Sequence, residues 1–252
     1  MRRLGVLLTM ILFATLATAA QPPSSYAASK VPFPRHPAAM QHLVIGHSVD
    51  GRAINAWRVG ERNKHTKTVV LMSAIHGNER QIPQILWSLR DGARIHGVNM
   101  WLIPVANPDG RARDTRQNAH GVDLNRNFPT GWVHTTGHYG SGPRPASEPE
   151  TRALMRFFKK VHPWRIVSFH QPLHGVDIAD KNVTFSRRLA RALRLPAEKV
   201  TCGGVCGGTM TQWYNSHFKG TAITVEYGAS PSKHLMQVQA PRELLHFFGA
   251  HR

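Results

Sequence analysis

The sequence predicts an α/β protein with a mainly parallel, mixed sheet that is covered by helices on both faces. Short and mostly apolar runs, such as residues 68–74 and 98–105, are typical of strands that are buried on both sides of a sheet. Segments with helical composition or helical periodicity follow several of these runs along the chain. Strands that alternate with helices are expected to form a parallel sheet with helices on both faces.

Each further element has a local signal. A turn at Gly51-Arg52 leads into a run of alternating apolar residues, and Asn107-Pro108-Asp109-Gly110 is typical of a turn. Ser147 and Glu150 have the spacing of a capping box that would open a helix. The predicted strands are 51–60, which includes the initial turn, 68–74, 98–105, 165–169 and 221–225. The predicted helices are 81–89, 147–160, 184–195 and 241–248.

The chain is predicted to have three parts. Residues 1–20 combine a basic start, a short apolar run and an Ala17-Thr18-Ala19 end, which is the pattern of a secretory signal peptide. The apolar run is short for a membrane span, and an uncleaved anchor is the alternative. Residues 21–40 are rich in Pro, Ser and Ala and are predicted to be a linker. Residues 41–252 are expected to form one catalytic domain.

The charge of the chain restricts its partners. Lys and Arg number 32 against 14 Asp and Glu, which gives a net charge of +18. An exported protein of this charge is expected to associate with an anionic cell-wall polymer or membrane surface, although the charge could serve solubility alone. The sequence has no zinc-finger spacing and no RNP-type motif, so nucleic acid is not an expected partner. The predicted location is secreted, periplasmic or cell-wall associated, and the oligomeric state is unknown from the sequence.

The chain has two cysteines, Cys202 and Cys206, in a glycine-rich stretch. In an oxidising compartment they are predicted to form a disulfide that closes a small loop. No second Cys or His pair has the spacing of a structural zinc site.

Ionisable residues stand at the ends of three predicted strands. His76 and Glu79 follow the strand 68–74, His170 follows 165–169, and Glu226 follows 221–225. Parallel strands present their carboxyl ends at one edge of a sheet, so these side chains can converge. Two histidines and a glutamate would leave a fourth zinc position open for water, as in a catalytic site. The alternatives are that His174 replaces His170 as a ligand and that Glu226 pairs with an arginine.

Several segments together resemble the zinc carboxypeptidases of the funnelin type, in the order in which that family has them, over roughly residues 45–230. The segments are His76-Gly-Asn-Glu79, Asn107-Pro-Asp-Gly110, Arg116-Gln-Asn118, Gly121-Val-Asp-Leu-Asn-Arg-Asn-Phe-Pro129, Ser147-Glu-Pro-Glu150, Ser168-Phe-His170 and Thr224-Val-Glu226. The resemblance implies a carboxypeptidase-like fold and a zinc metallopeptidase with one zinc ion, held by His76, Glu79 and His170.

The resemblance also implies roles for the remaining site residues. Glu226 would be the general base, and Arg116 would stabilise the oxyanion. Arg113 lies close enough in the sequence to compete with Arg116 for this role. Asn125 and Arg126 would bind the terminal carboxylate of the substrate, unless they serve only to order the polar loop 111–146.

Three segments resemble the bacterial murein peptide amidases more than the digestive carboxypeptidases: His76-Gly-Asn-Glu79, Gly51-Arg52-Ala53-Ile54 and His170-Gln171-Pro172-Leu173. Asn78 stands where the digestive enzymes have an arginine, and Tyr214 is a candidate for their mobile tyrosine. The murein peptide amidases cut between γ-D-glutamate and meso-diaminopimelate in cell-wall peptides. Asp177 and Asp180 are candidate partners for a substrate ammonium group. The alternatives are a carboxypeptidase for ordinary peptides with a basic or apolar C-terminal residue, and an inactive wall-binding protein of the same fold.

Overall fold

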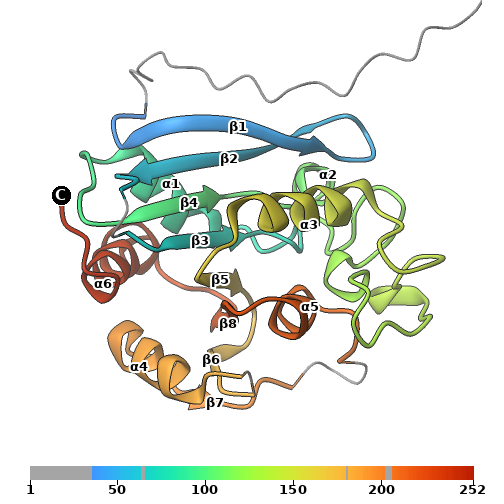
Figure 1. Cartoon of the computed structure of the whole chain (residues 1–252). Coiled ribbons are helices and arrows are strands. Elements are labelled where there is room, and N and C mark those ends of the chain that lie inside the picture. The colour runs from blue at the N-terminus through green and yellow to red at the C-terminus, as the bar shows by residue number, and fades with distance from the viewer. Residues whose placement is uncertain (1–35, 64–65, 180, 202–205) are drawn as a thin grey trace, which may run out of the picture.

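The described residues form a twisted mixed sheet of eight strands (Figure 1). The computed structural model describes residues 36–252, apart from 64–65, 180 and 202–205. The strand order is β1-β2-β4-β3-β5-β8-β6-β7, and the central pairs β4-β3, β3-β5 and β5-β8 are parallel. The predicted fold class is therefore confirmed. The strands are β1 Ala39–His47, β2 Ala53–Gly60, β3 Thr68–Ser73, β4 Asn99–Ile103, β5 Arg165–His170, β6 His174–Asp177, β7 Ala197–Glu198 and β8 Thr221–Tyr227.

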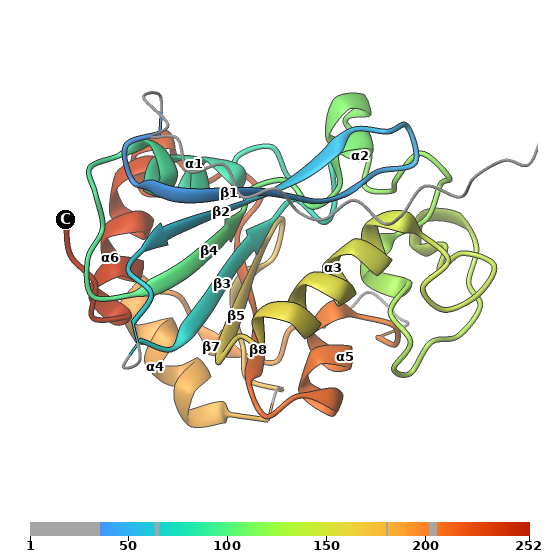
Figure 2. The same ribbon diagram turned by 45° about the horizontal axis from the view of Figure 1, so that its top comes forward.

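Helices cover the sheet on both faces, which Figure 2 shows from a second direction. Helices α1, α4 and α6 pack in one hydrophobic cluster, and α3 and α5 pack in the other. The helices are α1 Pro83–Asp91, α2 Pro108–Arg113, α3 Pro149–Val161, α4 Val183–Leu193, α5 Met210–His217 and α6 Ala240–Phe247, with 3-10 turns at Leu124–Arg126 and Gly137–Tyr139 and a π-helical turn at Leu235–Gln239. No helix in this part of the chain combines the length and the apolar character needed to cross a membrane.

Strand β3 is apolar because it is buried between the two helix layers. Val69 and Leu71 belong to the cluster of α1, whereas Val70 and Met72 belong to the cluster of α3. Successive side chains of a strand point to opposite faces, so a strand that is covered on both sides must be apolar at every position. All four side chains are accordingly buried.

Two predicted local structures are wrong, and in both cases other parts of the chain decide the outcome. Helix α3 has Glu148 at its N-cap, so Ser147 does not cap it. Ser147 Oγ instead donates to Glu148 Oε1 over 2.6 Å. Glu150 Oε1 accepts from the backbone N of Val49 over 3.2 Å. The pattern of a capping box is therefore present in the sequence, but its side chains bind elsewhere.

The second correction concerns the predicted turn 107–110, which opens the short helix α2. Asn107 is its N-cap and accepts from the backbone N of Gly110 over 2.9 Å, while Pro108 occupies the first turn. Asn and Pro favour a helix start as well as a turn, which explains the ambiguity. Strands β1, β6 and β7 and helix α5 were not predicted, and β1 begins inside the predicted linker at Ala39.

The signal peptide predicted at 1–20 and the linker as far as residue 35 lie outside the described residues. The predicted disulfide also lies outside them, because Cys202 does.

Gly77 allows the loop after β3 to pack against α2. A Cβ atom at this position would lie 1.9 Å from the carbonyl carbon of Gly110 and 2.2 Å from the nitrogen of Arg111. We expect Gly77→Ala to force these two backbones apart and to lower the free energy of unfolding by about 1–3 kcal/mol. Urea denaturation measures this change.

The control for this prediction is Asn78→Ala, because Asn78 is the exposed neighbour of Gly77. Its effect should stay within about 0.5 kcal/mol. Equal stability of Gly77→Ala and the unmodified protein would contradict the packing argument.

Candidate metal centre and active site

The register of the parallel strands brings the candidate residues to one edge of the sheet. His170 at the end of β5 is the Cα partner of Glu226 on β8, and Phe169 is the partner of Ser73 at the end of β3. His76 follows Ser73 by three residues. The carboxyl ends of three adjacent strands therefore meet here, as Figures 1 and 2 show.

His76, Glu79 and His170 form a buried group that could hold a metal ion. Each offers one ligand atom, and these atoms lie within 4.8 Å of one another. The side chains are only 2–4% exposed. The Nδ1 atom of His76 lies 2.7 Å from Glu79 Oε1, and the Nδ1 atom of His170 lies 3.2 Å from the same oxygen. Glu79 Oε2 is buried and has no hydrogen-bond partner among the described residues. An orphaned carboxylate oxygen beside two imidazole nitrogens fits a cation such as zinc.

The second nitrogen of each histidine has its own oxygen partner. His170 Nε2 forms a hydrogen bond of 2.9 Å with Ser168 Oγ, whereas His76 Nε2 lies within ion-pair distance of Asp123 Oδ1, at 3.2 Å, without a hydrogen bond. Such partners fix the orientation of the ring, and here they leave both Nδ1 atoms directed towards Glu79. His174 is exposed on β6 and does not belong to the group, so the alternative ligand is not supported by its position.

The charges in this group stabilise one another. Burial disfavours the charge of His76, but the carboxylates of Glu79 and Asp123 outweigh it and raise its pKa to about 9. Burial likewise disfavours the charge of Glu79, but His76 and His170 outweigh it and lower its pKa to about 2. Glu79 is thus held as a carboxylate, which is the form that binds a metal ion.

Glu226 lies beside this group in a cavity of about 660 Å³ that His76, His170 and Arg116 also line. Its side chain is 7% exposed, and Oε2 accepts from the backbone N of Leu173 over 3.2 Å. No arginine among the described residues forms an ion pair with it. Burial raises the pKa of Glu226, and the charge of Glu79 also raises it. A carboxylate with a raised pKa beside a metal site is suited to accept a proton.

The structure separates the two competing arginines. Arg116 lines the cavity, and its Nε and Nη2 atoms lie 2.9 and 2.8 Å from Asp123 Oδ2. Arg113 binds Asp50 Oδ2 over 2.8 Å through its Nη2 atom, outside the cavity lining. Arg116 is therefore the arginine placed beside the metal group.

Asn125 and Arg126 line the same cavity and also order the polar loop. Asn125 Oδ1 accepts from the backbone N of Met210 over 2.9 Å, which joins the loop to α5. Arg126 is almost fully buried, and this burial lowers its pKa, although the charge of Asp123 works in the opposite direction. Asn125 and Arg126 can therefore order the polar loop and also face a substrate carboxylate in the cavity.

Sequence reasoning missed two residues of the site. Asp123 is fully buried and contacts both His76 and Arg116, and its place inside the segment 121–129 could have identified it. The ring of Tyr139 lies 5.0 Å from the guanidinium carbon of Arg116 and 5.3 Å from that of Arg126, and no local signal pointed to it.

The prediction that Tyr214 is the mobile tyrosine of the active site is wrong. Its hydroxyl donates to the carbonyl of Pro163, and its ring stacks on Phe218 with 4.6 Å between centroids. It is a residue of α5 whose side chain is buried in the core, and it does not line the cavity.

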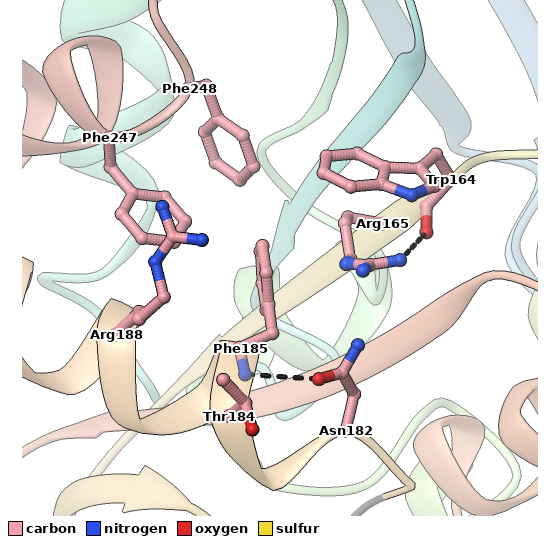
Figure 3. Close-up of a pocket in the computed structure, with 8 residues that line it drawn as sticks. All are labelled: Trp164, Arg165, Asn182, Thr184, Phe185, Arg188, Phe247 and Phe248. Carbon is pink, nitrogen blue, oxygen red and sulfur yellow. Dashed lines mark hydrogen bonds between the residues drawn. The ribbon is translucent and has the colours of Figure 1, made fainter.

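A second, smaller cavity of about 260 Å³ lies at the opposite end of β5, against α4 and α6 (Figure 3). Arg165 stacks there on Trp164 and Phe185, with its guanidinium carbon 3.9 and 4.5 Å from the ring centroids. None of the predicted site residues lines this cavity. The larger cavity is lined by His76, Arg116, Asn125, Arg126, His170 and Glu226, and Glu79 is buried beside His76 and His170.

Fold and site together define the class of protein. A mixed α/β sheet carries two histidines and a glutamate at the carboxyl ends of its parallel strands, with a further buried carboxylate beside them. Three protein ligands that leave a coordination position free are the mark of a catalytic zinc centre.

Comparison with known proteins identifies the family. The family model described as zinc carboxypeptidase matches residues 33–176, and the chain belongs to this family. Murein peptide amidase A of Escherichia coli K12 is 32% identical over 145 residues, which cover 50% of this chain and 58% of that protein. Mast cell carboxypeptidase A of Mus musculus is 24% identical over 157 residues, which cover 50% of this chain and 38% of that protein. The matched regions thus span 58% and 38% of the length of these two relatives.

Solved structures agree on the fold. The murein-tripeptide amidase of Escherichia coli O157 has a TM-score of 0.67 at 24% identity, covering 84% of this chain and 92% of that one. Carboxypeptidase A of Helicoverpa armigera has a TM-score of 0.70 at 17% identity, covering 84% of this chain and 68% of that one. The predicted carboxypeptidase-like fold is confirmed.

The hydrogen bond between Ser168 and His170 gives a prediction about the metal. We expect Ser168→Ala to leave His170 Nε2 without its partner and to weaken zinc binding roughly 10- to 100-fold. Competition with a chromogenic chelator measures the affinity. The control is Ser232→Ala, an exposed serine outside the cavity lining, which should bind zinc as the unmodified protein does. Unchanged affinity in Ser168→Ala would remove Ser168 from this role.

Proposed function

We propose that the protein is an exported, zinc-dependent carboxypeptidase or amidase that hydrolyses the γ-D-glutamyl-meso-diaminopimelate bond of cell-wall stem peptides. The observation that carries this proposal is the convergence of His76, Glu79 and His170 at a cavity that Glu226 also lines. The sequence match to a murein peptide amidase supports the choice of substrate.

One zinc ion would be held by His76, Glu79 and His170. When bound, it would polarise the scissile carbonyl and lower the pKa of a water molecule. Glu226 takes the proton from the attacking water and gives it to the leaving amine. Its backbone bond from Leu173 fixes one carboxylate oxygen and leaves the other for this transfer.

Arg116 stabilises the oxygen that becomes negatively charged during attack, a contribution of roughly 3 kcal/mol in comparable sites. Its position is set from two sides. Asp123 accepts from Nε and lies within ion-pair distance of Nη2, and the ring of Tyr139 lies against the guanidinium group. An arginine that is held in place before the reaction reorganises little when charge develops.

Asn125 and Arg126 bind the carboxylate of the leaving residue. Asn125 Oδ1 is engaged by Met210, so the amide Nδ2 is the group that can donate to the substrate. Arg126 adds a planar guanidinium in the same cavity, and its burial strengthens its attraction for a carboxylate.

The signal-peptide pattern of residues 1–20 and the net charge of +18 support a location at the cell wall, where the basic surface would associate with anionic polymers. The protein would accordingly be secreted, periplasmic or cell-wall associated.

The general base is tested by Glu226→Gln. We expect this variant to retain one zinc ion per chain but to lose turnover by about 100- to 10,000-fold, because the amide cannot accept the proton. Metal analysis and initial rates on the same sample give both quantities. His76→Ala, in contrast, should lose both zinc and activity. Near-normal turnover in Glu226→Gln would assign the proton transfer to another group.

The substrate is tested by product analysis on L-Ala-γ-D-Glu-meso-diaminopimelate and on ordinary peptides with basic or apolar C-terminal residues. We expect release of diaminopimelate that stops with a chelator and returns with zinc. Release only from the ordinary peptides would favour a general carboxypeptidase. A protein that hydrolyses none of them and contains no zinc would be the wall-binding alternative.

A further inference from the structure

The active-site cavity has a set of mostly polar wall residues in addition to those of the proposed mechanism. They come from α5 and its N-cap, from the start of β8 and from the segment before α4. Leu173, Ala179, Val200 and Cys206 line the same cavity. The wall residues are Asp177, Lys181, Thr209, Thr211, Gln212, Asn215, Ser216, Ala222 and Thr224.

Lys181 is a cation in this wall, and its ammonium group binds main-chain oxygens. Its ammonium group donates to the carbonyl of Asn215 over 3.1 Å and to the carbonyl of Phe218. It forms no ion pair with any described carboxylate. Burial lowers the pKa of Lys181, and the charge of Arg165 lowers it further. Two carbonyls satisfy two of the three N–H groups, so the third remains available to a ligand.

Lys181 is also held in place. Both of its acceptors belong to the end of α5 and the turn after it, and the Asn215 side chain is bound to the main chain of Ala222 by two hydrogen bonds of 2.8 and 3.0 Å. The ammonium group therefore does not need to be ordered when a substrate binds, which reduces the cost of binding.

We propose that Lys181 binds a carboxylate on the side chain of the leaving residue, and so selects residues whose side chain ends in an acid. This inference rests on the proposed function, because it assumes that the protein hydrolyses an amide bond in this cavity. It does not depend on whether that bond is γ-D-glutamyl or α-linked. The side-chain carboxylate is a second one, distinct from the terminal carboxylate that Asn125 and Arg126 bind. A leaving lysine or arginine would instead bring a second cation next to Lys181.

Asp177 extends this selection to an ammonium group. Its Oδ1 atom accepts from the backbone N of Ala179 over 2.9 Å and of Val200 over 3.3 Å, and it has no cationic partner among the described residues. Lys181 and Asp177 have no ion-pair partner among the described residues, and together they suit a side chain that ends in an amino acid group. The second stereocentre of diaminopimelate has this chemistry.

The test compares Lys181→Met and Lys181→Arg on peptides that differ only in the leaving residue. The three residues are meso-diaminopimelate, 2-aminopimelate, which keeps the side-chain acid but lacks the amine, and lysine, which keeps the amine but lacks the acid. Each is prepared both on γ-D-glutamate and on an ordinary α-linked acyl group.

We expect Lys181→Met to lose about 10- to 100-fold in kcat/KM on the two acidic side chains, mainly through KM, since one charged contact is removed. Its activity on the lysine peptides should rise, because the repulsion is gone. Lys181→Arg should recover most of the preference for acids. The control is Lys219→Met, because Lys219 is exposed and lies outside the cavity lining. This variant should keep the ratio of kcat/KM on acidic peptides to kcat/KM on lysine peptides that the unmodified enzyme has.

The outcomes separate the two proposals. An equal loss on all three residues in Lys181→Met, or an unchanged ratio of acidic to lysine peptides, would overturn the role of Lys181. Acid selectivity that appears only on the α-linked series would support Lys181 and reject the γ-D-glutamyl bond as the substrate.

Discussion

The parallel pairing of β3, β5 and β8 is the constraint on which the rest of the site depends. In this register the ends of the three strands lie side by side, with His170 directly opposite Glu226 and with Ser73 opposite Phe169. A shift by one residue would turn His170 into the core and move an apolar residue into its place. The apolar residues on both faces of β3 and β5 prevent this shift, because each face is buried under helices. The core therefore fixes the geometry of the polar residues at its edge.

Asp123 joins the metal group to the oxyanion group. Its Oδ1 atom lies 3.2 Å from His76 Nε2 and accepts from the backbone N of Asn125, while its Oδ2 atom receives Arg116. A fully buried carboxylate is costly unless it is paired, and these partners hold the pKa of Asp123 well below its usual range. The same contacts orient His76, Arg116 and the loop that carries Asn125. One side chain thus positions three parts of the proposed mechanism.

The segment 147–150 shows how far a local pattern can be trusted. Its spacing predicted a helix, and α3 does start there. The side chains of Glu148 and Glu150, however, do not form the predicted capping box. Both carboxylates accept from Asn118 Nδ2, over 2.8 and 3.1 Å, so the helix start is bound to the polar loop. Burial raises the pKa of Glu150, and the charge of Glu148 adds to this effect. Local spacing identified the element, whereas long-range hydrogen bonds decided the role of its side chains.

The sequence by itself determined the fold class, the central strands and the residues that converge at the strand ends, because apolar periodicity and the position of polar residues after buried strands are local properties. The family followed from the resemblance of the motifs. Only the tertiary structure decided that Arg116 and not Arg113 lies in the cavity, that Tyr214 belongs to the core, and that Tyr139 lies against the two arginines. The same holds for strands β1, β6 and β7 at the two ends of the sheet, whose pairing depends on neighbours and not on a strong apolar run. Contacts between distant segments carry no signal at the level of single residues, since they arise from packing of the whole chain.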